Sequence, residues 1–293
     1  MKRTRQTKQP DAILTADWHL REDNPKCRTD NFVEAQWKKV EFINQIQWAH
    51  GCPIIHSGDL FDHWKPSPAL LTKTLSVLPN KFYTIYGNHD LPQHNLELAY
   101  KCGINVLQEA ERLKVLNGTH WNQVTAESDL PLPENRKYLV YHVMTYKGKT
   151  PWPGCTDPKA GKLLRKYPQY DLIITGHNHQ TFVEEYDGRL LVNPGSLTRQ
   201  EADKTDHKPC VFLYYADTNT VEKVLLPFEE GVISREHLEV KQDRDDRIDA
   251  FVSRLNSDFQ GAVSFEDNLT RMIQENEIAE SVAEIIYKAV DTV

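Results

Sequence analysis

The chain has 293 residues, of which 26% are charged, and its formal net charge is −7 at pH 7. This length can bury the core of one large domain, with room for a small appendage. No apolar run is long enough to span a membrane, and the basic N-terminus lacks the apolar segment of a signal peptide, so we expect no membrane association. The negative charge argues against a broad basic surface for nucleic acid, although bound metal ions would add positive charge that this count omits.

The cysteines indicate a reducing environment. There are five of them, widely scattered, and none forms a C-x-x-C pair. We interpret them as free thiols, not as a disulfide framework or a zinc knuckle. The expected location is therefore the cytoplasm, or the host cytoplasm if the gene is viral.

The first part of the chain alternates predicted strands with predicted helices. The strands are short and apolar, and the helices carry apolar residues at helical spacing. The strands cover 13–16, 53–55 and 82–86, and the helices cover 29–49, 68–78 and 96–100. This order is typical of a largely parallel sheet covered by helices.

The middle of the chain is richer in predicted strands. Single strands are expected at 104–107, 113–116, 121–125, 138–141 and 172–175, and two hairpins pair 182–183 with 190–192 and 211–215 with 221–226. Segment 147–158 is expected to be a loop. Together with the first part, this pattern predicts the α/β class, as a four-layered α/β/β/α sandwich.

The character of the chain changes near residue 229. Segments 239–255, 265–274 and 278–290 are charged and helix-prone, without strands. We therefore predict a main domain over 1–228 and a short helical C-terminal appendage over 229–293. The appendage either docks a partner or packs as a tail on the main domain.

Polar clusters follow five of the predicted strands. Asp17 and His19 follow the first, Asp59 the second, and Asn88, His89 and Asp90 the third, while His142 follows a later strand and His177 and His179 follow the next. Open α/β sheets gather ligand-binding groups at the carboxyl ends of their strands. Carboxylate, amide and imidazole ligands suit manganese, iron or zinc better than magnesium or calcium, which prefer oxygen.

The number of candidate ligands predicts the chemistry. Two Asp, one Asn and five His are too many for one ion and suit two ions that share a carboxylate. Two dications with Asp17 and Asp59 ionised leave a formal excess of two positive charges, which would hold a phosphate and generate hydroxide near neutral pH. No Walker loop, G-x-S-x-G elbow or G-x-G-x-x-G motif accompanies them, so the predicted reaction is attack of metal-bound hydroxide on phosphorus.

The five clusters, D-x-H, G-D-x-x-D, G-N-H-D, a single His and G-H-x-H, resemble the calcineurin-like metallophosphoesterase superfamily over roughly 11–226. The resemblance implies two divalent metals, with manganese preferred and iron or zinc as alternatives. It assigns Asp17, His19, Asp59 and His179 to one metal, and Asp59, Asn88, His142 and His177 to the other, with Asp59 as the bridge. It makes His89 either the proton donor to the leaving oxygen or a transition-state stabiliser, oriented by Asp90.

Within that superfamily, the chain is most similar to the SbcD-type DNA repair nucleases. The similarity rests on Gly58–Asp62 followed by Pro66–Pro68, and on Gly87–Pro92. It implies DNA as substrate, an SbcC-type coiled-coil ATPase partner that the helical tail would contact, and a homodimer. Two features depart from the pattern: Arg21 stands where those nucleases usually have a glycine, and the helical tail replaces their α/β capping domain.

We therefore predict a two-metal-dependent phosphodiesterase, and within that class a DNA exo- or endonuclease of the SbcD type. The alternatives are a small-molecule phosphodiesterase for cyclic nucleotides or nucleotide sugars, and a scaffold without catalysis. Three further residues are candidates for substrate contact: His63, Trp152 beside Lys147 and Lys149, and Arg199. For His63 and Trp152, a place in an ordinary surface loop is the alternative.

Overall fold

The computed structural model describes residues 8–116, 124–126, 130–257 and 265–290. Two compact units divide the chain, Met1–Ile233 and Ser234–Val293, and each is described by itself. The boundary between 228 and 229 that composition suggests stays a prediction.

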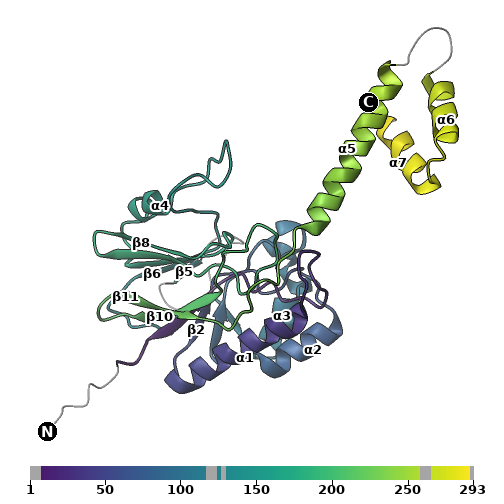
Figure 1. The fold of residues 1–293 in the computed structure, drawn as a ribbon. Helices are drawn as coiled ribbons and strands as arrows, with labels where there is room; N and C mark the ends of the chain where they lie inside the picture. Colours follow the sequence, from purple (N-terminus) through teal and green to yellow (C-terminus); the bar gives the residue numbers. More distant parts are fainter. Residues whose placement is uncertain (1–7, 117–123, 127–129, 258–264, 291–293) are drawn as a thin grey trace. The chain divides into compact units, whose positions relative to one another are not determined.

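The first unit contains a six-stranded sheet in the order β11-β10-β1-β2-β3-β4 (Figure 1). Strands β1 to β4 run parallel, and β10 and β11 are antiparallel to their neighbours. Their bounds are Ala12–Thr15, Ile54–His56, Phe82–Thr84 and Lys114–Val115 for β1 to β4, then Cys210–Tyr215 for β10 and Thr220–Leu225 for β11. The predicted strands at 13–16, 53–55 and 82–86 and the second hairpin are confirmed.

A five-stranded sheet in the order β5-β6-β7-β9-β8 forms the other half of this unit. Strands β6, β7 and β9 are parallel, while β5 and β8 are antiparallel edge strands. The bounds are Val124–Ala126, Tyr138–Tyr141, Leu172–Thr175, Phe182–Tyr186 and Arg189–Asn193 for β5 to β9. Residues 121–123 of the expected strand 121–125 lie outside the described residues.

Strand alternation creates the four layers. In the first sheet, Ile13 packs toward the helices α1 (Phe32–His50), α2 (Pro68–Val77) and α3 (Gly103–Glu109), while Leu14 packs toward the second sheet. In the second sheet, Ile174 faces the first sheet and Ile173 faces α4 (Ala160–Lys166), which covers the outer side (Figure 1). The predicted α/β/β/α sandwich is confirmed.

The structure corrects two local predictions. Segment 104–107, expected as a strand, belongs to α3, where Ile104 and Leu107 are buried one helical turn apart and Val106 between them is 46% exposed. A short apolar run does not distinguish a buried helix from a strand by periodicity. Helix α4 is absent from the sequence-based prediction, and 3₁₀ helices η1 (Pro92–His94) and η2 (Leu96–Lys101) replace the helix expected at 96–100.

The second unit is helical, as predicted. It contains α5 (Glu236–Ser257), α6 (Phe265–Glu275) and α7 (Glu280–Val290). Leu269 and Ile286 are buried at its small core, against Phe251 and Met272. None of the helices in the described ranges has the length and apolar character needed to cross a bilayer.

Candidate metal centre

The polar clusters converge at the carboxyl ends of β1, β2 and β3 in one sheet and of β6 and β7 in the other. Direct contacts join the two sheets there: Ser57 Oγ donates to the Thr175 carbonyl at 2.9 Å, and the His177 N–H donates to Asp17 Oδ1 at 2.9 Å. Four of the candidate ligands, Asp17, His19, Asp59 and His177, have left-handed φ angles of 49°, 44°, 59° and 72°. Such strain in non-glycine residues concentrates at functional sites.

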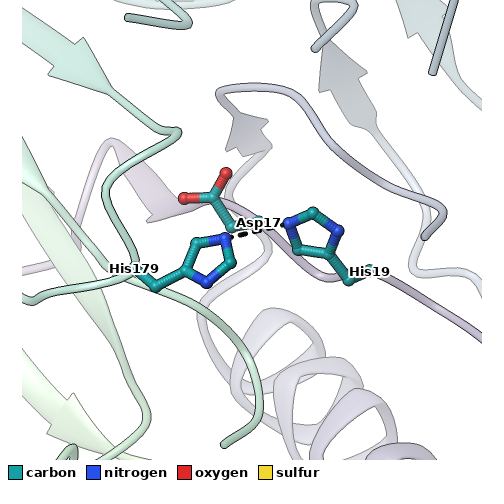
Figure 2. A group of neighbouring side chains, drawn as sticks. All are labelled: Asp17, His19 and His179. Carbon is teal, nitrogen blue, oxygen red and sulfur yellow. Dashed lines mark hydrogen bonds between the residues drawn. The ribbon is translucent and has the colours of Figure 1, made fainter. Parts of the chain in front are cut away.

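Asp17, His19 and His179 form the first donor set (Figure 2). Their ligand atoms lie within 4.8 Å of one another, and the two Nε2 atoms of His19 and His179 are 3.1 Å apart. The Nδ1 atom of His179 lies 3.2 Å from the Glu201 carboxylate. This contact places the proton on Nδ1 and leaves the Nε2 lone pair for a ligand, as carboxylate–histidine pairs do at metal sites.

The second donor set comprises Asp59, His142 and His177. Nδ1 of His142 donates to the Ser57 carbonyl at 2.8 Å, which turns Nε2 toward Asp59 Oδ2 at 3.1 Å. The Asn88 Oδ1 atom lies 3.0 Å from His142 Nε2 and 2.8 Å from His177 Nδ1. An oxygen thus faces two imidazole nitrogens, which is a mixed O/N donor set for a divalent ion.

Asp59 lies between the two sets. Its Oδ2 atom is 3.6 Å from His19 Nε2 of the first set and 3.1 Å from His142 Nε2 of the second. The carboxylate is almost fully buried, and its Oδ1 atom accepts from the His89 N–H at 2.8 Å. This position between the sets is the one that a bridging ligand requires; the ligation of each residue stays a prediction.

The electrostatics of the cluster favour a bound cation. Burial alone raises the pKa of Asp59, but His142 and the other imidazoles lower it well below its usual range. In turn, burial opposes the charged form of His142, and Asp59 overcomes that effect and raises the pKa of His142 to about 9. The proton at His142 is positive charge that a metal ion at the same place would displace, because metals bind deprotonated ligands.

Two further imidazoles are already neutral at neutral pH. Burial lowers the pKa of His19 well below its usual value, and burial together with His142 lowers the pKa of His177 to about 4. Neutral imidazole is the form that binds metal ions. The donor set therefore fits two divalent cations in composition, and His19 and His177 are already in the ligand form, whereas His142 would lose its proton to a metal ion.

Unsatisfied atoms and close-packed glycines support the same fit. Asp17 Oδ2 is buried and accepts no hydrogen bond from the residues that the structure describes. A Cβ atom on Gly87 would lie 2.1 Å from Asp59 Oδ1, and one on Gly176 would lie 2.9 Å from His142 Nδ1. Glycine at these positions lets the backbone approach the ligands closely.

Asp90 has a different role from the one expected. We expected it to orient His89, but its carboxylate accepts backbone N–H bonds from Gly87 at 2.9 Å, Asp59 at 2.7 Å, and Leu60 and Phe61 at about 3.1 to 3.3 Å. Nδ1 of His89 instead donates to the Asp62 carbonyl at 2.8 Å. A buried carboxylate is best satisfied by several N–H donors, and the loop around Asp59 supplies them.

The three expected substrate contacts lie outside the donor sets. His63 is exposed and stacks near Trp64, and Trp152 is 47% exposed in the loop between β6 and α4. Arg199 is buried, and its guanidinium donates to the carbonyls of Thr205 and Glu229. Substrate contact by these residues stays a prediction.

Sequence reasoning missed three residues that support the site. Glu201 contacts His179, Ser57 accepts from His142 through its carbonyl, and the Asp62 carboxylate lies 3.6 Å from His19 Nδ1 and 3.2 Å from Arg21 Nη1. Asp62 was recognisable as the second carboxylate of G-D-x-x-D. Glu201 and Ser57 carried no signal, since an acidic residue in a loop and a backbone carbonyl are common.

Two adjacent donor sets at the carboxyl edge of an α/β/β/α sandwich are typical of metal-dependent phosphoester hydrolases. The profile of the calcineurin-like phosphoesterase superfamily domain matches residues 13–218, and the chain belongs to that superfamily.

Among characterised relatives, the DNA double-strand break repair protein Mre11 of Saccharolobus solfataricus is 27% identical over 177 residues. The match covers 50% of this chain and 45% of the relative, so the chain aligns with about half of that protein's length. Two solved structures also show similarity. A novel archaeal phosphodiesterase is 16% identical with a TM-score of 0.43, and the match covers 73% of this chain and 99% of the other. Vacuolar protein sorting 29 of Cryptosporidium parvum is 16% identical with a TM-score of 0.38, and the match covers 76% of this chain and 100% of the other.

Proposed function

We propose that this protein is a two-metal-dependent phosphodiesterase that acts as a DNA nuclease of the SbcD type. The observation that carries the proposal is the pair of donor sets that meet at Asp59. Manganese is the metal we propose, because the mixed oxygen and nitrogen donors suit it. The partial likeness to a double-strand break repair protein supports DNA as the substrate.

Each cation would have its own set of ligands. One cation would be held by Asp17, His19 and His179, and the other by Asn88, His142 and His177. Asp59 would bind both cations. When bound, such cations polarise the phosphoryl oxygens and supply a hydroxide nucleophile at neutral pH. Ser57 and Glu201 would keep His142 and His179 oriented by holding their Nδ1 protons.

His89 would give a proton to the leaving group. Its side chain is exposed at the edge of the cluster, and its ring packs edge-to-face against His19 with centroids 4.6 Å apart. Because the Asp62 carbonyl can only accept, Nδ1 of His89 carries a proton and Nε2 is the free ring nitrogen. In the imidazolium form Nε2 also carries a proton, and it would give that proton to the departing oxygen and leave the neutral ring.

The test is a manganese-supplemented assay of the purified protein on end-labelled linear DNA, single- and double-stranded, beside a chromogenic phosphodiester. Asp59→Asn and His89→Ala are expected to lose activity on both substrates, by about 100-fold or more for Asp59→Asn. His50→Ala, which changes a histidine at the far end of α1, is the matched control and is expected to retain it.

The outcomes separate the alternatives. DNA degradation that is lost in both site variants supports the nuclease, and the product ladder gives its polarity. Hydrolysis of the chromogenic ester with all DNA left intact would replace the nuclease by a small-molecule phosphodiesterase. No hydrolysis of either substrate with any divalent metal would indicate a silent scaffold.

A coiled-coil ATPase subunit of the SbcC type is the partner we propose, with a homodimer as the assembly. The helical unit is the proposed contact, since its helices leave Val282, Ile285 and Tyr287 of α7 37%, 45% and 38% exposed. Removing residues 234–293 should abolish co-purification with the ATPase and spare cleavage of the chromogenic diester. Retained ATPase binding by the shortened chain would refute this contact.

A further inference from the structure

A cavity of about 290 Å³ lies in the first unit, outside the metal centre. It is bounded by the loop before α1, the first turns of α1, and the segment 227–229 after β11. None of the residues that line it belongs to the donor sets described above. Its lining combines apolar residues with four cationic side chains, Arg28, Lys38, Lys39 and Arg199.

Two of these cations are already neutralised by carboxylates. Arg28 forms a fork-like pair with Asp30, in which Nε and Nη2 donate at 2.7 and 2.5 Å. Lys38 is exposed and pairs with Glu34 at 2.8 Å. These pairs leave no net charge on that part of the lining.

Lys39 and Arg199 are the unusual pair. They are only 3% and 4% exposed, and neither forms a salt bridge with any carboxylate among the described residues. Lys39 Nζ makes one hydrogen bond, to the Ala35 carbonyl at 3.1 Å, so two of its three N–H donors have no protein acceptor in the described part of the chain. Arg199 donates to two backbone carbonyls, which use two of its five N–H donors and do not balance its charge.

Buried unpaired charge is costly, and an anion in the cavity would offset the cost. Burial and the nearby guanidinium groups of Arg28 and Arg199 lower the pKa of Lys39 to about 8. Lys39 is therefore mostly charged at neutral pH, and this buried charge costs the folded protein free energy. The Asp30 and Glu229 carboxylates act on Lys39 in the opposite direction but do not overcome these effects, and Glu229 is exposed to water. The Arg199 guanidinium is held over the Phe228 ring at 5.2 Å, which pre-positions it.

We propose that this cavity is a second anion site that binds a phosphate group through Lys39 and Arg199. Phosphate is the chemistry indicated, because it is a compact oxyanion that accepts hydrogen bonds on several sides, and lysine and arginine are its usual partners. The phosphate is either a free ion or the terminal phosphate of a nucleic-acid strand. The proposal does not depend on catalysis at the metal centre.

The experiment is isothermal titration of inorganic phosphate into the full-length chain in EDTA, where the metal centre cannot capture the ligand, and again with manganese. We expect saturable binding that persists in EDTA. Lys39→Met should weaken it at least 10-fold, whereas Lys38→Met, which removes a neighbouring exposed charge, should change it less than 2-fold. Lys39→Arg should restore most of the affinity.

Two further measurements complete the test. Titration of the unmodified protein with phosphate, followed by amide NMR shifts, should move residues 28–39 and 227–229; this readout does not rely on a variant that folds. A 5′-phosphorylated dinucleotide distinguishes the two sources, with the unphosphorylated dinucleotide as the control. If the phosphorylated dinucleotide binds more tightly than free phosphate, the site takes a strand end. If the two bind equally, the site takes the free ion. No saturable binding in EDTA, shifts confined to the metal centre, or equal affinity in Lys39→Met would overturn the proposal.

Discussion

Asp90 shows how one buried side chain can support the site through backbone hydrogen bonds. Its carboxylate accepts hydrogen bonds from the backbone N–H of Gly87 and from the N–H groups of residues 59 to 61 in the loop that carries Asp59. Those bonds hold Asp59 in its left-handed conformation, with a φ angle of 59°. The stability of the site loops therefore depends on the two acceptor oxygens of Asp90.

Replacing Asp90 by asparagine is expected to lower the free energy of unfolding by about 2 kcal/mol, because an amide offers one acceptor oxygen and turns an N–H₂ group toward N–H donors. Urea unfolding measures the change. Asp62→Asn is the control, since the half-exposed Asp62 carboxylate is expected to contribute less than about 1 kcal/mol. Equal effects of the two substitutions would contradict this role.

Lys39 is expected to make stability depend on pH in the alkaline range. Its pKa is about 8 in the folded protein and 10.5 at its ordinary value. Below pH 8 both the folded and the unfolded state hold the proton, and the folded state carries the full burial cost. As pH rises from 8 toward 10.5 the folded state loses the proton first, so its stability increases.

In phosphate-free buffer, the free energy of unfolding of the unmodified protein should therefore rise by about 2 kcal/mol relative to Lys39→Met between pH 7.5 and 9.5. Denaturant titrations at several pH values give the difference. Lys38→Met, at an exposed position, should run parallel to the unmodified protein. If the free energy of unfolding of Lys39→Met also changes with pH in parallel with that of the unmodified protein, the buried charge of Lys39 does not destabilise the fold.

At the scale of elements, the loops at the strand ends depend on close backbone approach. The loop after β3 passes so near the loop after β2 that a Cβ on Gly87 would overlap the Asp59 carboxylate and lie 2.5 Å from the Asp59 nitrogen. Both loops must therefore keep their backbone positions for Asp59 to lie between the two donor sets.

Gly87→Ala is expected to reduce kcat/KM for a chromogenic phosphodiester by about 100-fold, the cost of moving a ligand by roughly 1 Å. Gly161→Ala in α4 is the matched control, because its Cβ would meet only the far ends of two flexible side chains, Glu184 at 3.0 Å and Arg165 at 3.7 Å. Circular dichroism of both variants establishes that each is folded. Full activity in a folded Gly87→Ala variant would contradict the packing argument.

At the scale of the whole molecule, the first unit holds its own core. The three apolar clusters of the sandwich contain only residues before 234, and the helical unit has a separate small cluster. The donor sets also lie entirely within the first unit. Folding and catalysis by this unit should therefore not require the helices.

A chain that ends at Ile233 is expected to unfold cooperatively, with a melting temperature within about 4 °C of the full chain, and to retain hydrolysis of the chromogenic diester. Calorimetry and the manganese assay measure the two properties. Aggregation of the shortened chain, or loss of activity in a folded one, would show that the helical unit contributes to the sandwich.

Much of the fold followed from the sequence because its signals are local. Apolar strands such as 172–175 alternate residues between two cores, and helix 29–49 carries its own periodicity and a C-terminal Gly51 in the left-handed conformation. The gathering of the polar clusters was also predictable, because parallel strands end at a common edge. Segment 104–107 was not, since four residues fit a strand as well as a helix.

By itself, the sequence determined the sandwich class, the family and the residues that meet at the candidate metal centre. Only the tertiary structure decided that Asp90 binds backbone N–H groups, that His89 donates to the Asp62 carbonyl, and that Glu201 supports His179. It also brought Lys39 and Arg199 to one cavity. The physical reason is that a side chain's partner depends on which distant segments the fold brings within hydrogen-bonding distance, and local patterns carry no information about that distance.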